Sequence, residues 1–153
     1  MLKLEETQYN TMTIDEIKAL PVKELCENDC LCFMWVVDSF LKEGIELLED
    51  WGFKYKTIAF NWIKHYESGA VCVNFAPYTL KSWEVCLLGV KGKVSNIKIC
   101  NSVQGLLTDV RTKHSKKPHE TRVRIEQLCG DRPKIELFAR QHVDGWDCWG
   151  DEV

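Results

Sequence analysis

The spacing of apolar residues along the chain predicts strands that alternate with helices. Between Ser39 and Trp51, the residues Leu41, Ile45 and Leu48 recur on one face of a helix. The uninterrupted apolar run before it, Cys30–Val37, has the length and composition of a buried strand. Two further helices are expected, one opened by the capping box Thr13–Glu16 and ended by Pro21, and one from Pro118 to about Leu128. The further expected strands are Phe53–Lys64, Trp83–Val90, a short one near Ile97–Cys100, and Lys134–Phe138. This order indicates an α/β fold whose sheet has a parallel component.

In an open α/β sheet, ligands bind beyond the carboxyl ends of the strands, so the residues just after each expected strand are candidates. They are Val37–Asp38, Lys64–His65 and Arg140–His142. Glu136 lies inside the last expected strand, where a carboxylate is costly unless it is paired. This residue fits two roles equally, as an acceptor for ribose hydroxyls or as one half of an ion pair with Arg140 or a lysine at a sheet edge.

Positive charge is most concentrated over residues 111–120. On charge alone, this segment is a solvated loop entering a helix. Lys117 differs from its neighbours because it precedes Pro118, at a helix start where backbone N–H groups also point outward. A cation beside free donors predicts an anion site. Glu84, just before the apolar run 85–89, either tethers this basic loop or is a surface acid at a strand start.

Composition narrows the class of protein. The 153 residues fit one domain, and 45% hydrophobic with 28% charged residues is ordinary for a globular protein. The net charge of −3 means that any nucleic-acid contact must come from a local patch. The longest apolar run is too short to span a bilayer and no signal-peptide core begins the chain, so we expect a cytoplasmic protein without membrane contact. None of the eight cysteines forms a Cys-x-x-Cys pair, so we expect reduced thiols and no metal site.

Eight motifs, in order along the chain, together resemble one family of enzymes. It is the adenine-N(6) methyltransferase family of the messenger-RNA adenosine methyltransferase catalytic subunit, which also has bacterial and phage members that act on DNA. The motifs are Tyr9–Ile17, Phe33–Val36, Trp51–Lys56, Trp62–Lys64, Tyr78–Thr79 with Glu84–Gly89, His114–Pro118, Lys134–Arg140 and Gly145–Gly150.

The resemblance implies a Rossmann-like sheet that uses S-adenosylmethionine to methylate the exocyclic amine of adenine in DNA or RNA. It assigns Lys117, Glu136 and Arg140 to the cofactor site, with His142 close by. The family usually has an asparagine where this chain has Asp151, which also falls in the cofactor site.

On the substrate side, the resemblance places Tyr9 near the target base and gives Glu84 the role of ordering substrate-side loops. The family's catalytic Asp-Pro-Pro-Trp motif, which normally comes shortly before Tyr9, is missing: the chain has no Pro-Pro pair, and eight residues precede Tyr9. In that motif, an aspartate and a proline carbonyl accept hydrogens from the adenine amine, and each such group contributes roughly 10²-fold or more to the rate. The segment Asn74–Tyr78 resembles a stretched form of the motif but has one residue too many.

No catalytic residue is therefore identified, and residues 1–153 are expected to form a single methyltransferase-like domain that is truncated at its N-terminus. Two hypotheses follow. The chain is a methyltransferase fragment whose catalytic strand lies elsewhere, or it is a non-catalytic member that binds the cofactor, nucleic acid or a partner subunit. A missing central strand leaves exposed sheet edges, so a protein partner or a second copy is expected to complete the sheet. An unrelated α/β interaction domain is the third interpretation.

Overall fold

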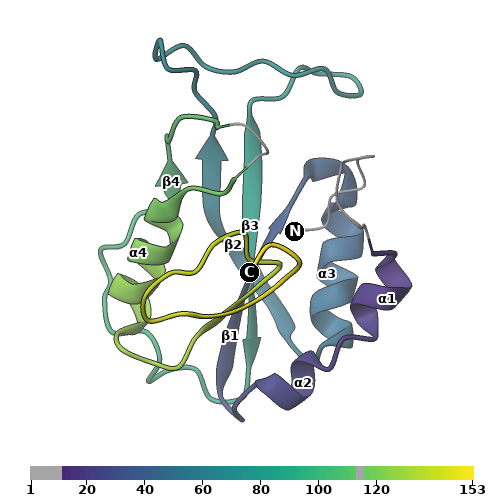
Figure 1. Ribbon diagram of the computed structural model, residues 1–153, viewed down its shortest axis with the longest axis vertical. Coiled ribbons are helices and arrows are strands. Elements are labelled where there is room, and N and C mark those ends of the chain that lie inside the picture. Colours follow the sequence, from purple (N-terminus) through teal and green to yellow (C-terminus); the bar gives the residue numbers. More distant parts are fainter. Residues whose placement is uncertain (1–11, 113–115) are drawn as a thin grey trace.

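A four-stranded sheet with helices on both sides forms the centre of the molecule in the computed structural model, which describes residues 12–112 and 116–153 (Figure 1). In chain order the elements are α1 (Ile14–Lys18), α2 (Val22–Leu25), β1 (Cys30–Val36), the 3₁₀ helix η1 (Asp38–Phe40), α3 (Leu41–Asp50), β2 (Lys54–Ile63), β3 (Trp83–Lys91), β4 (Leu106–Leu107), α4 (His119–Cys129), β5 (Ile135–Leu137) and β6 (Asp147–Trp149).

The main sheet is mixed, with the strand order β1-β3-β2-β4. The strand β3 pairs antiparallel with both β1 and β2, and β2 pairs parallel with β4. The expected parallel component is present but is confined in this sheet to the two residues of β4. The expectation of a strand near Ile97–Cys100 is wrong. Residues 97–100 instead form a turn and an irregular loop that is held to α4, where the Ile99 N–H donates to the Leu128 carbonyl at 2.8 Å.

Most local signals in the sequence are confirmed. The Thr13 hydroxyl accepts a hydrogen bond from the Glu16 backbone N–H at 3.2 Å, as the capping box predicts. The strongly amphipathic stretch forms η1 and α3, and Gly52 just after α3 has a φ of +88°, which favours glycine. Pro118 immediately precedes α4.

Two apolar clusters cover the two faces of the sheet. On one face, Leu47 and Leu48 of α3 pack with Met34, Val36 and Leu87. The other face holds the buried cluster Phe60, Trp62, Cys86 and Leu107, with Phe33, Trp35 and Ile125 of α4 packed against it. Because neighbouring residues of β1 and β3 belong to opposite clusters, both strands are covered on both faces.

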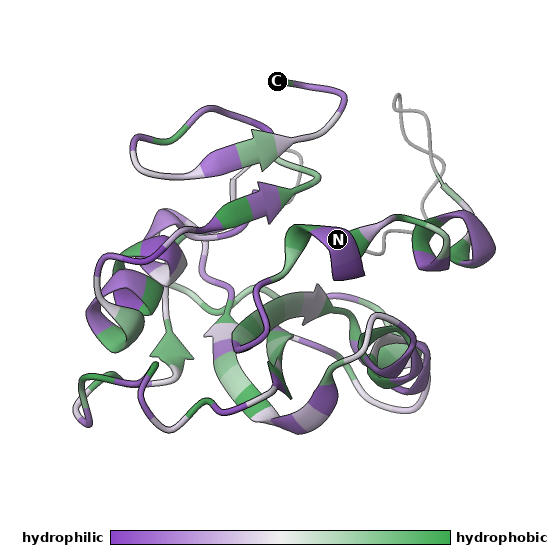
Figure 2. Cartoon of the chain, turned by 90° about the horizontal axis from the view of Figure 1, so that it is seen from below, coloured by the Kyte–Doolittle hydropathy of each residue, from purple (hydrophilic) through white to green (hydrophobic). Residues whose placement is uncertain are grey.

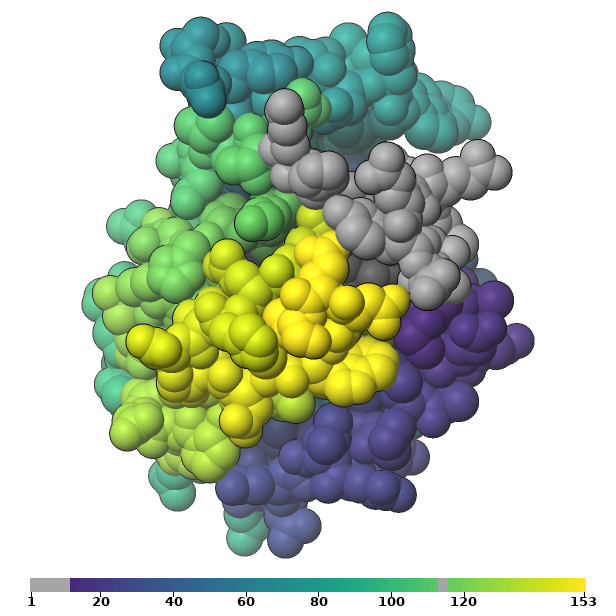
Figure 3. Space-filling view, viewed as in Figure 1, coloured from purple at the N-terminus to yellow at the C-terminus, as the bar shows by residue number. Residues whose placement is uncertain are grey.

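The C-terminal strands form a separate two-stranded parallel sheet, β5-β6, that stands apart from the main sheet (Figure 2). Glu136 lies in a strand, as expected, but this strand belongs to the small sheet rather than to the main one. β5 has three residues and pairs with β6 alone among the described residues. In the space-filling view, the C-terminal segment covers the surface between α4 and the N-terminal helices (Figure 3).

No helix in the described part of the chain is both long and apolar enough to cross a lipid bilayer.

Candidate cofactor and substrate site

A cluster of buried charges lies where β2 and β3 meet the basic loop. Glu84 of β3 has only 3% of its surface exposed. The Lys117 Nζ donates to both of its carboxylate oxygens, at 2.9 and 2.8 Å, and the Lys64 Nζ lies 3.1 Å from Oε2. Glu84 therefore tethers the basic loop, and the alternative of a surface acid is wrong.

Among the described residues, two ammonium groups and one carboxylate meet in this cluster. Both lysine side chains are largely buried, with 12% and 13% of their surface exposed. Aromatic rings give them further stabilisation: the Lys117 Nζ lies 5.7 Å from the ring centroid of Trp35, and the Lys64 Nζ lies 5.2 Å from that of Trp62. Burial would raise the pKa of the Glu84 carboxyl, but the charges and hydrogen bonds of Lys117 and Lys64 together hold this pKa below its ordinary value.

A cavity of about 480 Å³ separates β1 from β5. Three of the residues assigned to the cofactor by resemblance, Lys117, Glu136 and Arg140, line this one cavity although they come from two distant segments. Its volume is within the range of about 300–1,000 Å³ that is usual for small-molecule sites. The structure thus brings these three residues together.

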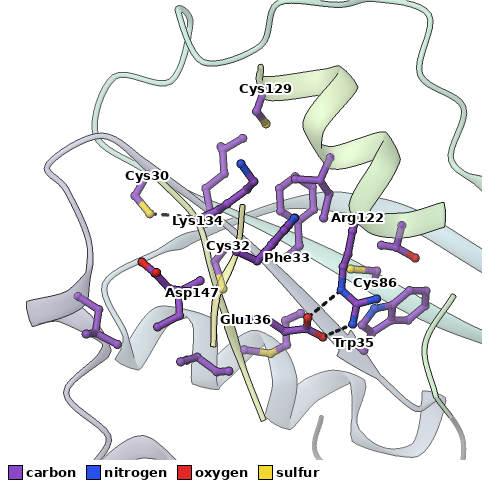
Figure 4. Close-up of a pocket in the computed structure, with 18 of the residues that line it drawn as sticks. Cys30, Cys32, Phe33, Trp35, Cys86, Arg122, Cys129, Lys134, Glu136 and Asp147 are labelled. Atoms are coloured by element: carbon purple, nitrogen blue, oxygen red, sulfur yellow. Dashed lines mark hydrogen bonds and ion pairs between the residues drawn. The ribbon is translucent and has the colours of Figure 1, made fainter. Parts of the chain in front are cut away.

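Glu136 is oriented by a residue that the sequence did not single out. The Arg122 Nε and Nη2 each donate to one oxygen of this carboxylate, both at 2.8 Å, in a bidentate pair (Figure 4). Of the two roles left open by the sequence, the ion pair is present, but its partner is Arg122 rather than Arg140 or a lysine. A carboxylate has about four lone-pair positions, so two acceptor positions remain for a hydroxyl ligand.

The chain changes direction sharply after β5. Phe138 has a φ of +58°, a left-handed conformation that costs a non-glycine residue about 1–2 kcal/mol. Its ring packs edge-to-face against Trp149 at 5.4 Å between centroids, and the Ala139 N–H donates to the Trp149 carbonyl at 3.0 Å. Gly150 approaches the Ala139 backbone so closely that a Cβ atom would lie 2.8 Å from its carbonyl oxygen. These contacts hold the turn that brings Arg140 back to the cavity.

One polar group in the wall of the cavity lacks a partner. Thr121, in the first turn of α4, is 5% exposed, and its Oγ1 atom makes no hydrogen bond in the described structure. An unsatisfied buried hydroxyl is costly, so its presence beside a cavity favours a polar ligand that would pair with it. No pattern in the sequence distinguishes this threonine.

The other predicted site residues lie elsewhere. His142 is exposed and lines a second cavity, which shares Arg122, Glu126 and Gln141 with the first, and its Nδ1 lies 3.1 Å from the Cys148 Sγ. Asp151 is exposed in the tail and does not line the cavity between β1 and β5. Tyr9 lies outside the described residues, as does His114 of the basic motif.

The segment Asn74–Tyr78 does not form part of the cavity. Phe75 and Tyr78 are fully exposed on the long loop between β2 and β3, which projects beyond the end of the sheet (Figure 1). Asn74 instead accepts a hydrogen bond from Arg111 and pairs with Lys81.

Thiols line part of the cavity and stay protonated. Burial raises the pKa of Cys32 to about 12, and burial together with the neighbouring Cys26 raises that of Cys30 to about 12. All eight cysteines are free thiols, and no group of three or more metal-ligating side chains occurs among the residues that the structure describes. These thiols therefore act as apolar lining.

Comparison with known proteins agrees with the sequence motifs. The profile of the MT-A70 family matches residues 1–152. The chain is 37% identical over 146 residues to "Type II methyltransferase M.MunI" of Mycoplasma sp, a match that covers 95% of this chain and 60% of the relative. It is 33% identical to "N(6)-adenosine-methyltransferase MT-A70-like" of Arabidopsis thaliana, covering 97% of this chain and 22% of the relative. It is 30% identical to "N(6)-adenosine-methyltransferase catalytic subunit METTL3" of Homo sapiens, a match that covers 90% of this chain and 23% of the relative.

The chain thus spans about three fifths of the length of the Mycoplasma relative and less than a quarter of the length of the plant and human relatives.

Proposed function

The chain belongs to the MT-A70 family, and we propose that it binds S-adenosylmethionine in the cavity between β1 and β5 and takes part in methyl transfer to the N(6) amine of adenine in DNA or RNA. The observation that carries this proposal is the convergence of Lys117, Glu136 and Arg140 on one cavity. The names of the relatives, which are methyltransferases, support the reaction class.

The residues present fit this cofactor chemically. Glu136 keeps acceptor positions for ribose hydroxyls while Arg122 holds it in place. The ammonium group of Lys117 suits the cofactor's carboxylate, and the unpaired Thr121 hydroxyl offers a further polar contact. S-adenosylmethionine, when bound, supplies the electrophilic methyl group. The chain's own residues hold the cofactor, and apolar side chains such as Phe33 exclude water from it.

The substrate half of the site rests on Tyr9 and Glu84. Glu84 acts indirectly in this proposal: by holding Lys117 and Lys64, it fixes the loop that leads into α4. Tyr9 is proposed to contact the adenine, and His142 and Asp151 are proposed to lie at the outer rim of the cofactor site.

The second hypothesis from the sequence requires only the binding half of the site, and Lys117, Glu136 and Arg140 belong to that half. On this view, the chain is a cofactor- or nucleic-acid-binding subunit, cytoplasmic like the enzyme it would serve, that needs a partner chain for catalysis. Both functions require cofactor binding in the same cavity. They differ in whether the chain transfers methyl groups without a partner.

Calorimetry with S-adenosylmethionine, followed by transfer of labelled methyl groups to adenine-containing DNA and RNA, separates the two. Binding with turnover is expected for the enzyme, and binding without turnover for the subunit. Lys117→Ala should weaken cofactor binding, whereas Lys98→Ala, an exposed lysine outside the cavity, should not. If the chain does not bind the cofactor, or if both variants bind it equally well, the cofactor site is not where we place it.

A further inference from the structure

The long loop between β2 and β3 carries two aromatic side chains that lie outside the core. Phe75 and Tyr78 are fully exposed, whereas side chains of this size usually bury most of their surface. The loop projects beyond the end of the sheet at which β2 finishes and β3 begins (Figures 1 and 3). Large exposed apolar groups that gather in one place mark a site of contact with another molecule.

The segment from Asn74 to Lys81, hereafter the aromatic hairpin, is closed at its base. Asn74 and Lys81 exchange both backbone hydrogen bonds, each at 2.9 Å. Between them, Tyr78 has a φ of +66°, a left-handed conformation that is rare for a large side chain. Such strain persists where the surrounding structure imposes it, and it is concentrated at functional sites. The hairpin therefore holds its exposed rings on a defined backbone.

The charges around the aromatic hairpin suit a polyanion. From residue 68 to residue 83 the sequence has no acidic side chain, so no carboxylate of the hairpin would repel a phosphate. The exposed Arg111 lies at the base of the hairpin, where its Nη1 donates to the Asn74 Oδ1 at 3.2 Å. A guanidinium has several N–H donors, so within the described structure Arg111 keeps donors for a phosphate oxygen. Lys81, by contrast, is paired with Asp38 at 3.2 Å.

The aromatic hairpin extends from the same end of the sheet as the charged cluster around Glu84. The Lys64 N–H donates to the Ser82 carbonyl at 2.8 Å, which ties the start of the loop to the residues just before β3. His65 forms a parallel bridge with Val110, so the chain that follows β4 runs beside the same loop. Both parallel strands, β2 and β4, thus end here. The carboxyl ends of strands are where ligands of open α/β sheets bind.

We propose that the aromatic hairpin stacks the rings of Phe75 and Tyr78 on nucleobases next to the target adenine, while Arg111 contacts a phosphate. Every base has a π-face, so stacking of this kind requires unstacked bases rather than one sequence. Such bases occur in a single strand, and in a duplex when a nucleotide is rotated out of the stack. The inference rests on the proposed function, because it names the part of the nucleic acid that the chain contacts beside the adenine.

Fluorescence anisotropy of the full chain with labelled oligonucleotides tests this proposal. The probes are an adenine-containing single strand of DNA, its intact duplex, and the same duplex with one adenine opposite an abasic site. Phe75→Leu keeps an apolar side chain but removes the ring. Tyr78→Gly removes the ring and suits the φ of +66°, so it should not lower the melting temperature. Each variant should weaken binding about tenfold for the single strand, for the duplex with the unpaired adenine, or for both.

Three further variants serve as controls. Tyr78→Phe keeps the ring, and Leu80→Ala removes an exposed side chain that has no ring, so both should bind like the wild type. Arg111→Gln should reduce the slope of log affinity against log salt concentration by about one, as the loss of a phosphate contact predicts.

The pattern across the probes decides the outcome. A ring-dependent loss on the single strand supports stacking on a flexible strand, and the same loss on the duplex with the unpaired adenine supports stacking beside a rotated nucleotide. Equal affinity of the wild type, Phe75→Leu and Tyr78→Gly for all three probes would overturn the proposal and leave the rings to a protein contact. Absence of binding of every probe by the wild type would overturn it as well.

This proposal and the proposed function fail separately. Phe75 and Tyr78 do not line the cavity between β1 and β5, so their variants should bind S-adenosylmethionine as the wild type does. Cofactor binding together with nucleic-acid affinity that does not depend on the rings removes the stacking and leaves the cofactor site. Ring-dependent binding of nucleic acid without cofactor binding does the reverse.

Discussion

Replacing Glu84 by glutamine should destabilise the protein far more than an ordinary loss of charge. The carboxylate neutralises two lysines that are largely buried, with contacts of 2.8 Å to Lys117 and 3.1 Å to Lys64. The Glu84→Gln variant keeps the shape of the side chain but removes the negative charge that both ammonium groups contact. Removing one partner of a buried ion pair costs about 3–5 kcal/mol. For a chain of this length, such a loss lowers the melting temperature by roughly 10 °C.

The pH dependence of stability provides a second test of the contribution of the Glu84 carboxylate. The pKa of Glu84 is lower in the folded protein than in the unfolded chain, so its contribution is fully present above the unfolded pKa, which is about 4.3. That contribution is lost as the pH falls through the lower folded value. We therefore expect a large difference in stability between the wild type and Glu84→Gln at pH 7, and convergence of the two proteins in acid.

Thermal unfolding followed by circular dichroism between pH 7 and pH 3 measures both effects. Glu49→Gln, an exposed acid on α3, is the matched control and should change stability by no more than about 0.5 kcal/mol. A Glu84→Gln variant as stable as the wild type at pH 7 would refute the reasoning, as would a difference that stays constant down to pH 3.

Three further predictions concern the cavity and the thiols. Thr121→Val replaces an unpaired buried hydroxyl by a methyl group, so it should raise the free energy of unfolding by about 1 kcal/mol and weaken binding of S-adenosylmethionine. A lower melting temperature of this variant in thermal unfolding would contradict the prediction. Arg122→Lys cannot form the bidentate pair with Glu136 and should lower cofactor affinity about tenfold in calorimetry, and unchanged affinity would show that this pair does not orient the site. Iodoacetamide at neutral pH should label Cys100 before Cys32, as followed by mass spectrometry. Hydrogen bonds from Ser102 lower the pKa of the partly exposed Cys100, whereas burial raises the pKa of Cys32, and the reverse order of labelling would contradict these two environments.

The elements with strong local signals could be predicted from the sequence. The amphipathic run Ser39–Trp51 and the apolar run Cys30–Val37 both bury enough surface to specify their own structure. The strands β4 and β6 could not be predicted, because they have two and three residues and exist only through pairing with distant strands. Placing β5 in a separate sheet also depends on such pairing, and a three-residue strand carries no sign of which sheet it will join.

The candidate site shows the same limit. Lys117 and Glu84 could be suggested from their positions beside a helix start and a strand start, but their mutual contact depends on the tertiary fold. Arg122 and Thr121 belong to a helix of low amphipathicity, and nothing in their spacing marks them. Their importance comes from what α4 packs against, which a single sequence does not reveal.

The two groups of charged residues are held by different sheets, and this predicts where a bound cofactor restricts motion. Glu84 and Lys117 are fixed to the main sheet through β3, whereas Glu136 and Arg140 belong to the small sheet through β5 and the turn after it. A cofactor that contacts both groups stabilises one placement of the small sheet relative to the main sheet. S-adenosylmethionine should therefore slow hydrogen–deuterium exchange both at Lys117 and in β5, and protection confined to one of these two places would contradict contact with both groups.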